Sequence, residues 1–321
     1  MPFDVGNSPN TVNSLEVVIS NFEDLQAGAE DVLLPEIRWN KVIPLASVDT
    51  SINPGARSAS YLVRDRRGRG DFRGRKGSNA PSVGTTVDKV MVPIESSGVT
   101  ANFDRADARS VLMGNDQNLM TELGEVMRES SERHIESTFF FGYDDLDYRG
   151  FLDYPGVPAT TAALNGGATS TAWADKTADE VIFDIQSGLA DVFTGSNTVH
   201  IPGKVLLPPA QFSFLTTTKA GTSDASKSIM EYLTTNNIYT AETGQALEFM
   251  HLRYLDEAGA GDTARMVFME ADVKNFWMPM PLPFDMMTPQ ERGFGVDLLA
   301  EYVFGSFHVK RPLCMQYVDG I

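Results

Sequence analysis

The residues with the greatest capacity for chemistry form one basic block, "RDRRGRGDFRGRKG", at positions 64–77. Its cationic side chains are Arg64, Arg66, Arg67, Arg69, Arg73, Arg75 and Lys76. Only two acidic residues lie among these seven, so the block carries +5, while the whole chain carries −17 and the remainder therefore −22. Guanidinium groups bind carboxylates and phosphates. The block therefore predicts attraction to an anionic surface: nucleic acid, a membrane, or another copy of this acidic chain.

A second charged pattern lies further along the chain. Its glutamates follow spacings of three, four, three and four, which gathers them on one stripe of a helix; they are Glu122, Glu125, Glu129, Glu132 and Glu136. Arg128 and Arg133 flank this acidic stripe. Two interpretations remain open. The stripe is either a solvated face neutralised by its own ion pairs, or the surface that accepts the basic block of a neighbouring subunit.

The motifs of common enzymes are missing. The four histidines are far apart, and the sequence has no HExxH, GxSxG or GxxxxGK[ST] motif. One cysteine, Cys314, allows neither an intrachain disulfide nor a cysteine-based zinc site. "YDDLDY" lacks the spaced ligands of an EF-hand, and Arg73 stands where a dinucleotide fingerprint needs its third glycine. We therefore predict no enzyme, no catalytic residue, no metal and no cofactor.

Composition limits the possible partners. The pI near 4.6 argues against a general nucleic-acid binder and predicts repulsion from anionic lipid. The first residues lack the pattern of a signal peptide, and no apolar run approaches the length of a membrane helix. We expect a soluble protein of a reducing compartment with no membrane contact. A solvated loop and an Arg/Gly segment that binds nucleic acid remain alternatives for the basic block, although Phe72 is its only aromatic residue.

The elements around the charged patterns can be predicted from periodicity. Ser58–Asp65 and Thr85–Ile94 read as strands, so they form a two-stranded arm with the basic block at its tip. Asp116–Phe140 reads as a long helix that stops before Gly142. Its predicted apolar face comprises Leu119, Met120, Leu123, Val126, Met127, His134, Ile135 and Thr138.

The second half of the chain mixes helices and strands. A helix begins after Thr177, which forms a capping box with Glu180, and its apolar stripe comprises Val181, Ile182, Ile185, Leu189 and Val192. "GKVLLPP" reads as a buried strand and "SIMEYLTTNN" as a short helix. "ALEFMHLRYL" and "TARMVFMEAD" read as strands joined by the hairpin loop "DEAGAGD". The last 27 residues alternate as strand, Gly305 turn and strand. This order predicts an α+β fold.

The order of several segments resembles that of tailed-bacteriophage major capsid proteins. The segments are "YRGFLDYPGV", "WADKTADEVIFDI", "LLPPAQFSFL", "SIMEYL" and the ending "RPLCMQYVDGI", and the resemblance spans Leu15 to Ile321. It implies a Hong Kong 97-like fold with five parts. These are an N-terminal arm (1–45), an extended loop (46–104), a peripheral domain with a spine helix (105–172), an axial domain (173–287) and a return to the peripheral domain (288–321).

The same resemblance implies a structural function. Pentamers and hexamers of the chain would close into an icosahedral shell around double-stranded DNA, assembled in the host cytoplasm and found in the virion. The extended loop would lie over a neighbouring subunit. The implied partners are the chain itself, a separate scaffolding protein, a portal and a decoration protein, with DNA contacted without sequence preference. An encapsulin-like compartment and an Arg/Gly-loop nucleic-acid-binding module remain the alternatives.

Overall fold

The computed structural model describes residues 34–68, 83–104, 119–221 and 224–321. The chain divides into two units, and the description below concerns the unit Ile37–Ile321. Arg69, Arg73, Arg75 and Lys76 lie outside the described residues, as do residues 116–118 of the predicted helix and the side chain of Arg67.

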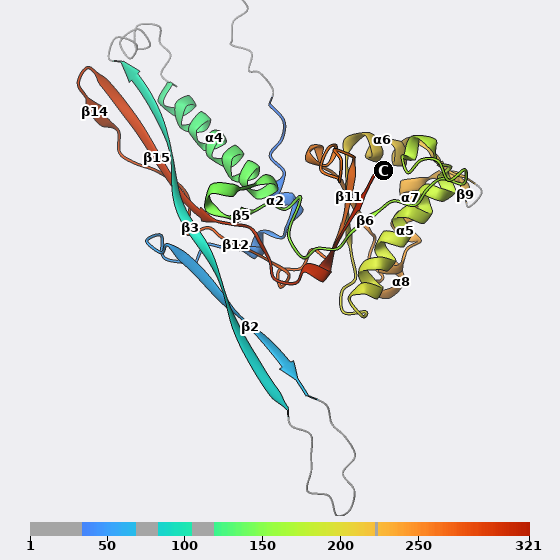
Figure 1. The fold of residues 1–321 in the computed structure, drawn as a ribbon. Coiled ribbons are helices and arrows are strands. Elements are labelled where there is room, and N and C mark those ends of the chain that lie inside the picture. The colour runs from blue at the N-terminus through green and yellow to red at the C-terminus, as the bar shows by residue number, and fades with distance from the viewer. Residues whose placement is uncertain (1–33, 69–82, 105–118, 222–223) are drawn as a thin grey trace, which may run out of the picture. The chain divides into compact units, whose positions relative to one another are not determined.

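A long antiparallel ribbon is formed by β2 (Ser58–Arg67) and β3 (Gly84–Asp104) (Figure 1). Their register runs from Ser58↔Pro93 to Arg67↔Gly84, which confirms the predicted two-stranded arm. β3 then continues and pairs with β15 (Gly295–Gly305) along its other half. Two further strands, β13 (Leu282–Met286) and β14 (Gln290–Arg292), pair with β15.

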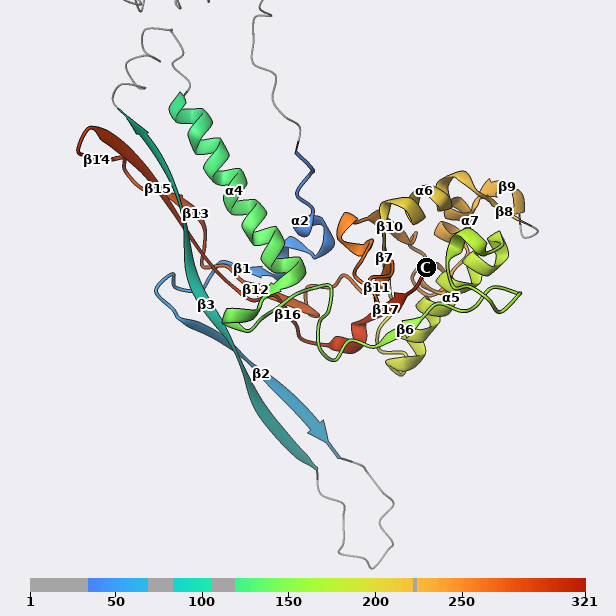
Figure 2. The same cartoon turned by 45° about the horizontal axis from the view of Figure 1, so that its top comes forward.

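The long helix α4 (Leu119–Phe141) follows β3 in sequence and packs against it and β13 (Figure 2). It ends at Phe141, and the next residue, Gly142, has a φ of +78°, which favours glycine. The predicted apolar face is correct for Met127, Ile135 and Thr138, which are buried, but wrong for Val126, which is 61% exposed. Met127 packs against Leu298 and Ala300 of β15. Because successive helix residues point about 100° apart, Val126 then points away from the strands.

A five-stranded sheet has the order β10-β7-β11-β17-β6. Its strands are β6 (Ala159–Thr161), β7 (Lys204–Leu207), β10 (Glu248–His251), β11 (Arg265–Met269) and β17 (Met315–Asp319). The helix α5 (Ala178–Gly195) packs on it with all five residues of its predicted apolar stripe buried. The Glu180 carboxylate accepts hydrogen bonds from the Thr177 backbone N–H (2.7 Å) and hydroxyl (2.9 Å), which confirms the capping box.

The predicted pairing of the later strands is wrong. β7 lies between β10 and β11, so "DEAGAGD" does not join a hairpin. β15, β16 (His308–Val309) and β17 belong to three different sheets. The last strand, β17, pairs with β11 and with β6 in the five-stranded sheet. Alternation identifies a strand but does not specify its distant partner.

Smaller elements complete the unit. The predicted helix at Ser228–Asn237 is confirmed as α7 (Ile229–Thr235), with Ser228 as its N-cap. Two helices were not predicted, α6 (Pro209–Thr217) and α8 (Ile238–Thr243). The remaining helix and short strands are α2 (Trp39–Val42), β1 (Val48–Asp49), β4 (Gly142–Tyr143), β5 (Tyr148–Arg149), β8 (Lys219–Ala220), β9 (Asp224–Ser228) and β12 (Phe276–Pro279).

Candidate subunit-contact surfaces

The ribbon carries the described part of the basic block. Arg64 and Arg66 lie on β2 with exposed side chains, opposite Val87 and Thr85 of β3. The register also brings exposed Lys89 opposite Leu62, next to Arg64 on the same face. Lys89 is separated from the basic block in sequence and was not predicted to belong to it. The two-residue period of the paired strands was the signal that could have joined them.

The acidic stripe on α4 is partly neutralised within the helix. Arg133 Nη2 lies 2.6 Å from Glu129 Oε1, and Arg128 Nε lies 3.1 Å from Glu132 Oε1, both at i,i+4 spacing. These contacts support the interpretation of an internally paired, solvated face for those two glutamates. Glu125 and Glu122, about one and two turns before Glu129, are exposed and form no ion pair with any residue in the described ranges.

Glu136 does not belong to an exposed stripe, so this part of the prediction is wrong. Its side chain is 2% exposed and accepts a hydrogen bond of 3.0 Å from the Arg38 backbone N–H. Its other oxygen lies 3.8 Å from Arg253 Nη2. The last turns of α4 are covered by α2 and by the 3-10 turn Arg253–Leu255, which come from distant parts of the sequence. Glu136 therefore serves the packing of the subunit.

His134 joins α4 to β15 through a hydrogen bond of 2.6 Å between its Nδ1 and the Tyr302 hydroxyl. Burial lowers the pKa of His134 below its ordinary value of 6.5. Burial does the same to the pKa of His308, with a smaller contribution from Lys310. The folded subunit therefore disfavours protonation of both imidazoles.

We expect His134→Gln to reduce the acid sensitivity of the unassembled subunit. The folded pKa is below the unfolded one, so the unfolded chain binds more protons as the pH falls through about 6.5. The stability contributed by neutral His134 is complete above that value and is lost below it. Urea unfolding at pH 7.5, 6.5 and 5.5 measures this. A variant whose stability falls as steeply as that of the wild type would contradict the assignment.

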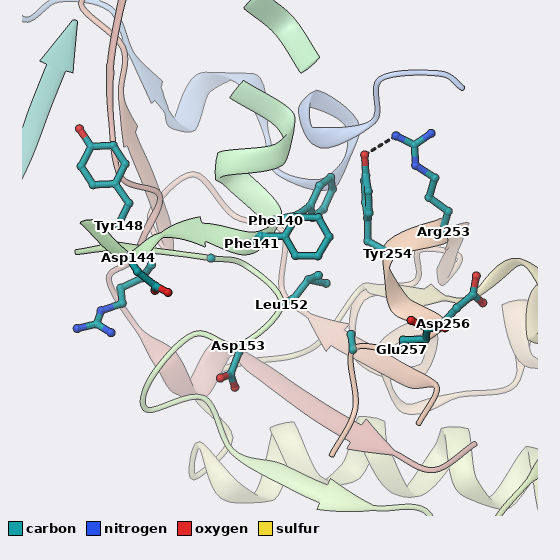
Figure 3. A pocket seen from close by; sticks show the side chains of 13 residues that line it. Phe140, Phe141, Asp144, Tyr148, Leu152, Asp153, Arg253, Tyr254, Asp256 and Glu257 are labelled. Carbon is teal, nitrogen blue, oxygen red and sulfur yellow. Dashed lines mark hydrogen bonds between the residues drawn. The ribbon is translucent and has the colours of Figure 1, made fainter. Parts of the chain in front are cut away.

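A pocket of about 630 Å³ lies beside the end of α4 (Figure 3). Phe140, Phe141 and Tyr254 contribute aromatic walls, and the Arg253 guanidinium donates a hydrogen bond to the Tyr254 hydroxyl. The pocket's carboxylates stand apart around it: Asp144 and Asp153 on one side, Asp256 and Glu257 on the other. Within the described ranges, no group of three or more His, Cys, Asp or Glu residues could hold a metal ion.

Among the helices in the described part of the chain, none is long and apolar enough to cross a membrane. Two features stand out as candidate contact surfaces: the ribbon with its basic residues, and the long helix α4 with the exposed glutamates of its first turns. Both are surfaces suited to contacts between macromolecules.

Comparison with known proteins agrees with this description. The family model described as "Major capsid protein" matches residues 68–321. A capsid chain of the Myoviridae phage XM1 superimposes with a TM-score of 0.77 at 16% identity, covering 94% of this chain and 98% of that one. A capsid chain of a native GTA particle gives a TM-score of 0.60 at 13% identity, covering 98% of this chain and 99% of that one. A chain from Gordonia phage Cozz gives a TM-score of 0.59 at 13% identity, covering 99% of this chain and 97% of that one. The search of curated proteins gave no match.

Proposed function

Because the chain belongs to the major capsid protein family, we propose that it assembles as pentamers and hexamers into an icosahedral shell that encloses double-stranded DNA. The α+β, Hong Kong 97-like fold predicted from the sequence is confirmed by the tailed-phage capsids that share it. The chain is a structural protein of a bacteriophage capsid. The proposed partners are other copies of the chain, a separate scaffolding protein, a portal, a decoration protein and non-specifically held DNA, with assembly in the host cytoplasm.

The observation that carries the assembly proposal is the ribbon. From Leu62 outward, the described residues of β2 and β3 pair with one another, and Figures 1 and 2 show no other element alongside them. An isolated two-stranded ribbon is marginally stable in water. A ribbon of this length is therefore expected to lie on another subunit.

We propose α4 of a neighbouring subunit as the surface that accepts the basic block. Glu122 and Glu125 supply charge that the helix itself leaves unneutralised within the described ranges, while Glu129 and Glu132 contribute through their partly exposed side chains. Such a match of charge orients the partners and speeds their association more than it adds affinity. We also propose the five-part domain division given above, and we propose to assign 315–319 to the axial domain because β17 pairs with β11.

Electron microscopy of the purified chain, alone and coexpressed with a scaffolding protein, tests the function. Closed shells or capsomer rings are the expected result. Packaged double-stranded DNA in shells from infected cells would support the phage capsid, whereas a specific protein cargo would indicate an encapsulin-like compartment. A strictly monomeric chain at high concentration, with the scaffolding protein present, would refute assembly.

We expect serine substitutions in the basic block to impair assembly without unfolding the subunit. The variant changes Arg66, Arg67, Arg69, Arg73 and Arg75 to Ser. The polar, glycine-rich composition of the block gives it no core of its own, and substitutions outside a core usually alter stability by no more than about 0.5 kcal/mol each. Thermal unfolding should therefore remain close to wild type while shell yield falls. Calorimetry and sedimentation measure the two effects. A large loss of subunit stability would show that the block serves folding instead.

A further inference from the structure

The β2–β3 ribbon has two chemically different faces. Because side chains alternate along each strand and directly opposed residues share a face, the register assigns each position in 59–66 and 85–92 to one of them. The first, here called the body face, comprises Ala59, Tyr61, Val63 and Asp65 with Thr86, Asp88, Val90 and Val92. The second, here called the outer face, comprises Ser60, Leu62, Arg64 and Arg66 with Thr85, Val87, Lys89 and Met91.

The base of the body face is covered by the subunit itself. Ala59 and Val92 are buried together with Trp277 and Val303. The Tyr61 ring lies edge-on to Trp277, with 5.3 Å between the ring centroids. The apolar residues at this end of the body face are thus explained by intramolecular packing.

The outer face is left uncovered by the described chain. Leu62 is 60% exposed, Val87 is 50% exposed and Met91 is 62% exposed. These three apolar side chains stand among the cations Arg64, Arg66 and Lys89, and no acidic residue belongs to this face as defined above. Single exposed apolar residues need no explanation, but three on one face of a projecting ribbon form a patch of the kind that marks a protein contact. DNA phosphates would engage the cations and leave this apolar part without a partner.

A second copy of the chain offers the complementary chemistry. The exposed side of α4 combines the carboxylates of Glu122 and Glu125 with Val126, the residue expected in the core but found 61% exposed. Val126 can pack against the apolar side chains of the outer face, while Glu122 and Glu125 can pair with its cations. We infer that the outer face of the ribbon, and not its body face, packs on this side of α4 in a second copy. This inference rests on the proposed function.

Adjacent residues on opposite faces provide the test. Leu62→Glu places a carboxylate on the outer face, and Val63→Glu makes the matched change on the body face, where Val63 is 40% exposed. Burial of one Leu side chain corresponds to about a tenfold or larger change in the association constant of each contact. We therefore expect L62E to reduce shell yield at least tenfold, and V63E to assemble within about twofold of wild type.

Thiol labelling gives a second, milder readout. Cys314 is buried, so it contributes little background. Maleimide should label both L62C and V63C in unassembled subunits, whereas shells should protect L62C only. Assembly of the wild-type chain is measured in parallel. If the proposed function is wrong, neither the wild type nor any variant forms shells, and this result differs from a failure of the inference about the outer face.

The outcomes divide cleanly. Loss of assembly by L62E alone, with protection of L62C, supports the inference. Normal assembly of both glutamate variants, equal failure of both, or failure of V63E alone would overturn it. Normal assembly of L62E with loss of packaged DNA would assign the outer face to nucleic acid and would also overturn it.

Discussion

Lysine at both Glu122 and Glu125 is expected to reduce shell yield at least tenfold at low ionic strength. The change removes two carboxylates that the described part of the subunit leaves without an ion pair, and it sets two cations against the basic ribbon of the neighbour. Two exposed pairs contribute roughly 0.4–2 kcal/mol together, and repulsion adds a similar amount, so each contact loses roughly 0.8–4 kcal/mol. A loss of about 1.4 kcal/mol is already tenfold, and the loss is repeated at every such contact in a shell. Static light scattering and electron microscopy measure the yield.

A compensating charge reversal on the ribbon tests whether the ribbon and α4 contact each other directly. Arg64→Glu and Arg66→Glu in the same chain should partly restore assembly, because opposite charges again face each other. Asp191→Lys with Glu242→Lys is a matched control, since both residues are exposed on other helices and the net charge changes equally. Wild-type yield from the Glu122/Glu125 variant in low salt, where screening is weakest, would exclude this side of α4 as the acceptor.

Lys176→Met is expected to lower the free energy of unfolding of the subunit by about 3–5 kcal/mol. Lys176 Nζ lies 2.5 Å from Asp184 Oδ2, and the two side chains are 1% and 2% exposed. The same carboxylate oxygen accepts a hydrogen bond of 3.0 Å from Trp173 Nε1. Removing the lysine leaves a buried carboxylate without its counter-ion, beneath the first turns of α5. Urea unfolding of unassembled subunits measures the loss.

A double-mutant cycle separates the ion pair from packing. Asp184→Asn alone should also destabilise the subunit, because it leaves the ammonium group buried. The double variant K176M/D184N should recover much of the loss, since no buried charge remains and the amide oxygen can still accept from Trp173. Additive losses in the double variant would contradict a direct coupling between the two charges.

Local sequence patterns were sufficient for most elements of the fold. The Thr177–Glu180 capping box, the apolar stripe of α5 and the glycine after α4 are signals contained within a few turns, and each was found as predicted. The ribbon was predicted because two β-type runs flank a segment whose polar, glycine-rich composition cannot form a core. The order of the segments along the chain was enough to indicate the capsid family.

The strand partners and the final form of the acidic stripe depended on tertiary structure. β7 separates β10 from β11, and β17 joins the five-stranded sheet, because such pairings are set by contacts between distant segments. Helical spacing predicted an exposed Glu136 and a buried Val126, whereas Glu136 is buried and Val126 is exposed. Periodicity defines which residues share a face, but only the elements packed on the helix decide which part of that face is covered. The outer face of the ribbon likewise required the register, because its cations and apolar residues come from two strands that meet only in the folded chain.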